Sequence, residues 1–363
     1  MKKKIFMLFR FSAVAIMIAA CLASAGLLLP QAASAASGQG KLRILATTYP
    51  VYLLARNVVQ SNPGAQVDLL IPAQTGCPHD YALTPKDMQK LAQADVLLLN
   101  GLGLDNFMLK ALPNAKPGLV VVDSSAGVVP LKEGNVHEDG DDDHEGHEGG
   151  HEDHDGHEHA ARHGHEESAH GHGGHDHEQG HEHGHHHDHG GINPHAFASP
   201  RLAAVMVKNM AQGLAKADPQ NAASYESSAS AYQKVLLGLS ERLAALGAKA
   251  PNKGIALMHD ALSYMAHDAG LEVIAVIQEN EEAQPSAGRL IKVAEILREH
   301  KPALIASEPQ YSDKAVQTLA REVGIPAAQL DSLASGPASP ALDHYEKTMN
   351  NNINILEKYF EPR

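Results

Sequence analysis

Residues 42–60 read LRILATTYPVYLLARNVVQ and place a strand pattern directly before a helix pattern. Leu42–Thr47 is a short, mostly apolar run, which is typical of a strand that is covered on both faces. Val51–Gln60 follows with apolar residues at helical spacing. A covered strand followed by a helix predicts an α/β unit built on a parallel sheet.

The same alternation continues through most of the 363-residue chain. Further short apolar runs predict strands at residues 67–71, 95–100 and 119–123, and later at 255–259, 272–277, 303–308 and 328–333. The stretches between them predict helices at residues 85–94, 104–111, 200–217, 220–246, 260–269, 286–299, 313–323 and 340–359. We therefore expect an α/β fold of two similar lobes with mostly parallel sheets.

The helix predicted at residues 220–246 separates the two sets of strands. A helix of about 27 residues spans roughly 40 Å, which is long for one small lobe and suits a rigid connection between two. We expect an N-terminal lobe of residues 41–136 and 190–219, this linking helix, and a C-terminal lobe of residues 252–363. The ligand site should lie in the cleft between the lobes.

Residues 137–189 interrupt this pattern with a tract that has almost no residue able to enter a core. The tract holds 19 of the chain's 25 histidines and 17 acidic residues against one arginine. Such a composition cannot bury enough apolar surface to fold, so we predict a disordered loop. Neutral imidazoles bind zinc, copper and nickel, so we expect this loop to bind metal ions. The alternative is a merely solvating linker, which would use Glu, Ser and Lys instead.

The histidine-rich loop also accounts for the acidity of the chain. The whole chain has a formal net charge of −14, and the loop alone contributes −16. The remainder is therefore close to neutral, at about +2 by subtraction. A near-neutral remainder predicts no basic face for nucleic acid.

Residues 1–35 have the pattern of a secretion signal. Positive charges at Lys2–Lys4 precede apolar stretches, and Ala33–Ala35 is a small-residue cleavage motif. The alternative is cleavage before Cys21, which would leave a lipid-anchored protein. Without Cys21, Cys77 is the only cysteine, so we expect no internal disulfide.

Three of the six histidines outside the loop fall where a predicted strand gives way to a helix. These three are His79, His195 and His259. Parallel α/β sheets bind ligands beyond the carboxyl ends of their strands, so the three should converge if the lobes face each other. His267 follows His259 by eight residues, or roughly 12 Å along a helix, so both cannot bind one ion and we select His259.

A carboxylate would complete a tetrahedral site with three imidazoles. Asp331 lies between leucines at the end of the last predicted strand, and its alternative role is that of a helix or turn cap. Glu308 is the rival ligand, or an acceptor behind a ligand. Cys77, two residues before His79, could supply a thiolate, and the alternative is a buried inert thiol.

Five fragments occur in an order that resembles a known family. They read CPHDYALTP, INPHAFASP, MHDALSYMAHDAGLE, SEPQYSDKAVQTLAREVGI and QLDSLAS, and resemble motifs of the cluster A-I metal-binding proteins, the periplasmic zinc- or manganese-binding components of ABC importers. The resemblance spans Lys41–Tyr359 apart from the loop. It implies that the metal ligands are His79, His195, His259 and Asp331. Zinc members are similar to this chain in the third histidine and the acidic His-rich loop, whereas manganese members tend to carry Glu at that position.

Three departures from the family pattern lie in or near the motifs. Phe197 stands where the family usually has tryptophan, the Pro-Ser motif near residues 282–286 is degenerate, and Cys77 does not correspond to a family ligand. None of the three changes the four residues that the resemblance implies as ligands.

These observations predict a secreted receptor that holds Zn²⁺ between its lobes and is not an enzyme. The resemblance implies a periplasmic, monomeric protein that delivers zinc to the membrane permease of an ABC importer, with the loop as a zinc-collecting segment. A filled tetrahedral site has no water position, and the sequence contains no HExxH motif. The alternatives are a zinc hydrolase and a metal buffer whose only function is the loop.

Deleting residues 137–189 distinguishes a receptor from a buffer. We expect the deleted protein to bind fewer ions and to load more slowly at scarce zinc, because the loop presents weakly held ions near the site. The dissociation constant of one tight site should change only a few-fold. Isothermal titration and stopped-flow loading of both forms measure these quantities, and loss of the tight site would show that the loop supplies its ligands.

Overall fold

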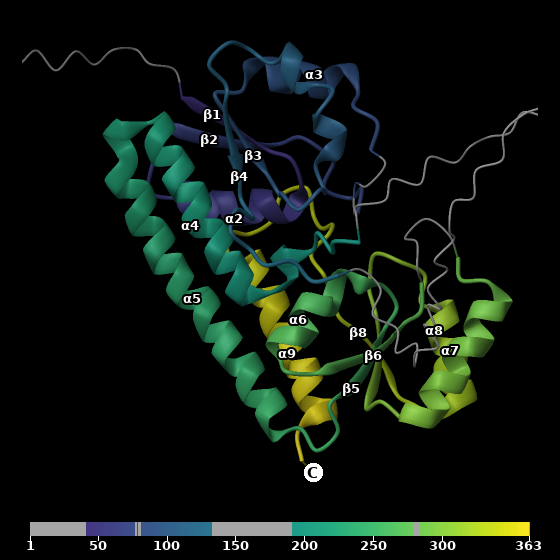
Figure 1. Ribbon diagram of the computed structural model, residues 1–363. Helices are drawn as coiled ribbons and strands as arrows, with labels where there is room; N and C mark the ends of the chain where they lie inside the picture. Colours follow the sequence, from purple (N-terminus) through teal and green to yellow (C-terminus); the bar gives the residue numbers. More distant parts are fainter. Residues whose placement is uncertain (1–40, 77, 79–80, 133–190, 279–283, 363) are drawn as a thin grey trace, which may run out of the picture. The chain divides into compact units, whose positions relative to one another are not determined.

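The computed structural model describes residues 41–76, 78, 81–132, 191–278 and 284–362, and it contains two four-stranded parallel sheets (Figure 1). This confirms the predicted α/β fold of two lobes. The predicted signal, the histidine-rich loop, Cys77 and His79 lie outside the described residues. Among the helices of the described segments, none has the length and apolar character needed to cross a membrane.

The first sheet has the strand order β2-β1-β3-β4 and every pairing in it is parallel. Its strands are β1 (Leu42–Ala46), β2 (Ala65–Leu69), β3 (Val96–Leu99) and β4 (Val120–Asp123). Helix α2 (Tyr49–Val59) joins β1 to β2, and α3 (Pro85–Gln93) precedes β3. Thr84 and Asp87 form a reciprocal capping box at the start of α3, as the Thr-Pro sequence there predicts.

The second sheet repeats this topology in the order β6-β5-β7-β8, again with parallel pairings throughout. Its strands are β5 (Gly254–Leu257), β6 (Glu272–Val276), β7 (Leu304–Ser307) and β8 (Ala327–Gln329). The helices of this lobe are α6 (Ser263–Asp268), α7 (Ala287–His300) and α8 (Lys314–Val323). In both sheets the first strand lies between the second and the third, so the strand order reverses beside β1 and β5, which is where parallel α/β sheets commonly bind ligands.

Two predicted helices were wrong in part. Residues 104–111 form only a short 3-10 turn, Asn106–Met108, with a second at Leu112–Asn114. Their apolar spacing is real, since Leu104, Met108 and Ala111 are buried, but Gly103 has a positive φ and Pro113 lacks the backbone N–H that an α-helix needs. The last helix, α9, begins at His344 rather than near residue 340 and runs to Phe360.

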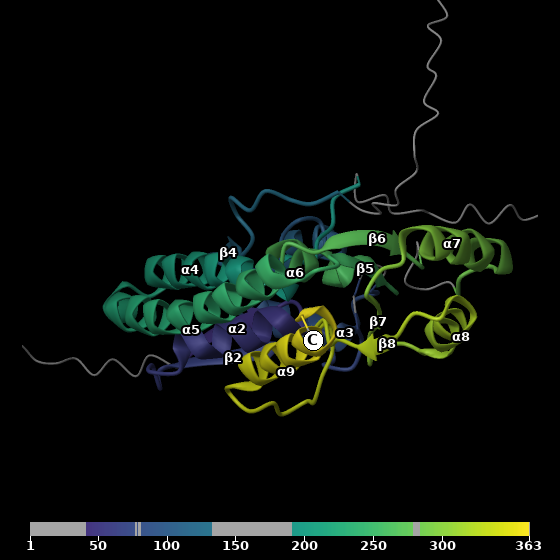
Figure 2. The ribbon, with the colours of Figure 1, turned by 90° about the horizontal axis from the view of Figure 1, so that it is seen from below.

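The helix predicted to link the lobes is α5 (Ala222–Lys249), which follows α4 (Pro200–Ala217). Helix α5 packs along α4 and α2 of the first lobe and against α6 and α9 of the second (Figures 1 and 2). Helix α9 also contacts α2. One hydrophobic cluster includes Ile44 and Val96 of the first sheet together with Ile255 and Leu304 of the second, so the lobes share a core.

Residues 334–343, between β8 and α9, form a connector that crosses from the second lobe to α2 of the first. The backbone N–H of Gly336 donates to the carbonyl of Ala73 at 2.9 Å. The side chains of Tyr49, Arg56 and Asn57 donate to the carbonyls of Pro337, Pro340 and Leu342 respectively. The connector therefore has polar contacts with the first lobe along its length.

Gly336 tests how tightly this connector is packed. A Cβ at position 336 would lie 2.5 Å from the hydroxyl oxygen of Tyr49, so Gly336→Ala should lower the free energy of unfolding by roughly 1–3 kcal/mol. Gly238→Ala is the matched control, because its Cβ would meet no atom within 4 Å on the exposed face of α5. That control should raise stability by roughly 0.5–1 kcal/mol through helix propensity. Urea unfolding measures both, and equal stabilisation by the two changes would contradict the close packing.

Candidate metal site

His195 lies in the turn that leads from the first sheet to α4, and the amide of Asn193 fixes its position. The Oδ1 of Asn193 accepts hydrogen bonds from the His195 backbone N–H at 2.9 Å and from its Nδ1 at 3.0 Å. An amide oxygen can only accept hydrogen bonds, so Nδ1 of a neutral His195 must carry the proton. The lone pair of the ring is then on Nε2. An imidazole in this tautomer can bind a metal through Nε2.

His259 lies two residues beyond the end of β5, at the start of the turn that leads into α6. The backbone N–H of Ala261 donates to its Nδ1 at 3.3 Å, and Oε2 of Glu308 lies 3.7 Å from the same nitrogen. The ring of Tyr311 is tilted against the imidazole at a centroid distance of 5.8 Å. Glu308 therefore lies beside His259, but Nδ1 accepts its hydrogen bond from the Ala261 backbone and not from a group that Glu308 could replace, so both roles that the sequence suggested for Glu308 stay predictions.

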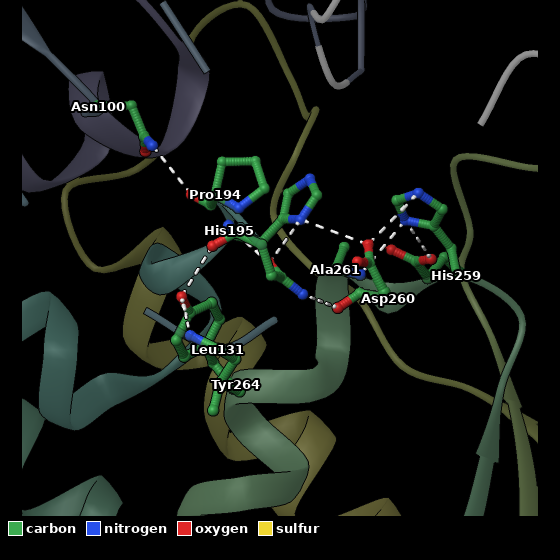
Figure 3. Close-up of polar contacts among 10 residues, drawn as sticks. Asn100, Leu131, Pro194, His195, His259, Asp260, Ala261 and Tyr264 are labelled. Carbon is green, nitrogen blue, oxygen red and sulfur yellow. Dashed lines mark hydrogen bonds and ion pairs between the residues drawn. The ribbon is translucent and has the colours of Figure 1, made fainter. Parts of the chain in front are cut away.

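The structure brings these two histidines together (Figure 3). Their ring centroids are 5.5 Å apart with the planes at 78°, and the residues are only 1% and 5% exposed. The carboxylate of Asp260 lies 3.6 Å from Nδ1 of His195 and 3.7 Å from Nε2 of His259. Two buried imidazoles this close together supply nitrogen donors of the kind that suits zinc, nickel or copper.

The turn that carries His195 is also joined to the second lobe by hydrogen bonds. Nδ2 of Asn193 donates to the carbonyl of Asp260 at 2.9 Å, and the Tyr264 hydroxyl donates to the carbonyl of Asn193 at 2.7 Å. The same hydroxyl accepts from the backbone N–H of Leu131 at 3.0 Å. Figure 3 shows Tyr264 beneath the turn and Asp260 beside His259. The spacing of the two histidines is therefore fixed by bonds between the segments that carry them.

Asp331 lies in the loop after β8, not within the strand as the sequence suggested. Its Oδ1 accepts from Nε2 of Gln310 at 2.6 Å and from the backbone N–H of Leu333 at 2.8 Å. Gln310 is the neighbour of Tyr311, so the loop that contacts Asp331 also contacts His259. Among the described residues, no three His, Cys, Asp or Glu side chains converge as one metal site. His79 is not described, so the four-residue ligand set stays a prediction.

Sequence reasoning missed two contributors to this site, and it set aside one histidine. The two contributors are Asn193, two residues before His195 in the INPH sequence, and Asp260, directly after His259 in the MHD sequence. The side chain of His267 is 61% exposed on α6, with Asp268 at 3.8 Å. Its exposure agrees with the helix-length argument that favoured His259.

A buried polar group supports the His195 turn from the first sheet. Nδ2 of Asn100 donates to the carbonyl of Pro194 at 3.0 Å (Figure 3). Next to Asn100, the backbone N–H of Gly101 donates to Oδ2 of Asp105 at 2.7 Å. Burial raises the pKa of the Asp105 carboxyl to about 6, although hydrogen bonds from Thr47 and the backbone partly oppose this shift.

The arrangement of the lobes is that of solute-binding proteins. The SBP FpvC from P. aeruginosa in complex with Ni²⁺ is 27% identical, with a TM-score of 0.66 over 88% of this chain and 97% of that chain. The family model of the zinc-uptake complex component A periplasmic matches residues 44–359, so the chain belongs to that family. This confirms the resemblance, and the family is a transport component rather than an enzyme.

Two curated relatives agree with this membership. The high-affinity zinc uptake system protein ZnuA of Bacillus subtilis is 30% identical over 90% of this chain and 88% of its own length. The zinc-binding lipoprotein AdcA of Streptococcus pneumoniae is 28% identical over 88% of this chain. The chain spans only 56% of the length of that second relative.

Asp105 gives a pH-dependent test of the support beneath the His195 turn. Its pKa in the folded state is raised, so its contribution to stability is present below the unfolded value near 3.8 and is lost as pH rises through about 6. Asp105→Asn should therefore gain stability relative to the native protein between pH 4 and pH 7, by at most roughly 3 kcal/mol. Urea unfolding across this range measures the difference. A constant difference would contradict a buried, titrating carboxyl.

Proposed function

We propose that this protein is an extracytoplasmic zinc receptor that captures Zn²⁺ and delivers it to the membrane permease of an ABC importer. The observation that carries the proposal is the buried pair His195 and His259, whose rings lie 5.5 Å apart at the junction of the two lobes. Two imidazoles from different lobes at this spacing can bind one ion between them. Membership in a zinc-uptake family supports the same function.

The complete site in this proposal has four protein ligands. His195 and His259 bind through nitrogen, His79 adds a third imidazole, and Asp331 adds a carboxylate oxygen. Three neutral imidazoles and one carboxylate leave the bound zinc with a net charge of +1, and they fill a tetrahedron. Asn193 would act behind the ligands, because its Oδ1 accepts a hydrogen bond from Nδ1 of His195.

The choice of zinc rests on donor chemistry and on relatives. Imidazole suits zinc and nickel better than it suits calcium or magnesium. Zinc is the ion in the names of the B. subtilis and S. pneumoniae relatives, whereas the FpvC structure contains Ni²⁺. We assign zinc as the cargo and keep nickel and manganese as competitors in the test. Residues 1–35 would direct export to the periplasm, and residues 137–189 would collect zinc for the site.

Substitution of the paired histidines tests the site directly. In the protein that lacks residues 137–189, His195→Ala and His259→Ala should each weaken Zn²⁺ binding by at least about tenfold, because each removes a ligand. His79→Ala and Asp331→Ala should do the same. His267→Ala is the matched control, since that side chain is exposed on α6, and its affinity should match the parent protein. Competition titration against a chromogenic chelator measures each dissociation constant.

Two further measurements test the same site, one of its pH dependence and one of its metal preference. Binding should weaken as the solution is acidified, because a histidine must lose its proton to bind a metal. Titrations with Ni²⁺ and Mn²⁺ should give weaker binding than Zn²⁺. Equal losses at His259 and His267 would refute the assignment of His259 alone, and a tight site that survives both His195→Ala and His259→Ala would refute the proposed site.

A further inference from the structure

Helix α9 (His344–Phe360) contacts two segments that bear predicted metal ligands. One is the turn that carries His195, and the other is the loop that carries Asp331. We propose that α9 sets the spacing of these loops, with Tyr345 and Asn352 as positioning residues that touch no metal themselves. This inference rests on the proposed function, because it assigns a binding role to contacts that would otherwise serve stability alone.

Tyr345 is the contact between α9 and the His195 turn. Its side chain is fully buried, and its hydroxyl donates to the backbone carbonyl of Phe197 at 2.7 Å. Phe197 is two residues beyond His195 in the 3-10 turn Ala196–Ala198, and its ring packs edge-on against the imidazole at 5.7 Å. A hydrogen bond at this carbonyl therefore fixes the turn and the ring that supports His195.

Asn352 is the contact between α9 and the Asp331 loop. Its Oδ1 accepts from the backbone N–H of Asp331 at 2.9 Å, and its Nδ2 donates to the backbone carbonyl of the same residue at 2.8 Å. Asn352 is fully buried, so its amide has to find its hydrogen-bond partners within the protein. Leu333, two residues further on, has a φ of 66°, a backbone conformation that surrounding contacts must maintain. The amide of Asn352 therefore fixes Asp331 at two points.

The two positioning residues lie on the same face of one rigid element. Tyr345 and Asn352 are seven residues apart, which is about two helical turns and roughly 10 Å along the axis. Between and beyond them Met349, Ile353 and Leu356 pack into the core that the two lobes share. Arg242 of α5 also pairs with Glu357 on α9 at 2.6 Å. The helix is thus held in place independently of the two loops, as a spacer must be.

The test compares metal affinity with stability in matched variants. Tyr345→Phe removes only the hydroxyl, and Asn352→Leu removes both amide contacts. Tyr225→Phe and Asn62→Leu are the controls, because Tyr225 is equally buried and donates to Asp218 at 2.8 Å, while Asn62 also makes one donor and one acceptor contact. All four should lower Tm, but only Tyr345→Phe and Asn352→Leu should weaken Zn²⁺ binding, by about tenfold. Asn352→Ser replaces the leucine variant if that does not fold.

Double variants show whether each residue acts through its own loop. The effect of Asn352→Leu on zinc affinity should disappear in an Asp331→Ala background, and the effect of Tyr345→Phe should disappear in a His195→Ala background. Additive effects in both backgrounds would overturn the positioning roles. Native protein that binds no zinc would refute the receptor itself. The role of α9 alone would be refuted if the native protein binds zinc and the zinc affinities of Tyr345→Phe and Asn352→Leu match those of their controls.

Discussion

The side-chain amide of Asn193 is the interaction on which the geometry of the candidate site depends. The amide oxygen accepts hydrogen bonds from the imidazole and from the backbone N–H of His195. The amide nitrogen donates to the carbonyl of Asp260, the residue after His259. A single buried group thus connects the histidine of the first lobe to that of the second. Buried polar networks of this kind enforce one arrangement, because a donor or acceptor that loses its partner away from water is costly. The 5.5 Å spacing of the rings follows from these bonds.

The site is rigid because the lobes are joined at several independent places. They share one hydrophobic cluster, and α5 and α9 pack against elements of both. The connector 334–343 also accepts hydrogen bonds from side chains of α2 and donates one from its backbone to Ala73. Separating the lobes would expose this shared apolar surface and break these bonds together. The carboxyl ends of two parallel sheets are therefore held opposite each other, and the turns that follow the strands can carry ligands at a fixed distance.

Much of the fold could be predicted because local pattern and tertiary environment agree. All eight predicted strands are present, since covered parallel strands are short apolar runs that stand out from amphipathic helices. The helix predicted at residues 104–111 failed because a correct apolar spacing was bounded by Gly103 and Pro113. The start of α9 was placed too early, because residues 340–343 belong to a connector whose hydrogen-bond partners lie on α2, far away in the sequence.

By itself, the sequence determined the α/β class, the family and the selection of His195 and His259, because strand-to-helix junctions and family motifs are local features of the chain. Only the tertiary structure decided that these two rings meet, that Asp260 lies between them, and that Asn193 joins them. It also decided that α9 reaches both loops, through Tyr345 and Asn352. Apart from the neighbours His259 and Asp260, these contacts join residues more than 20 positions apart. Their distances depend on how two sheets pack on one core, which no local pattern specifies.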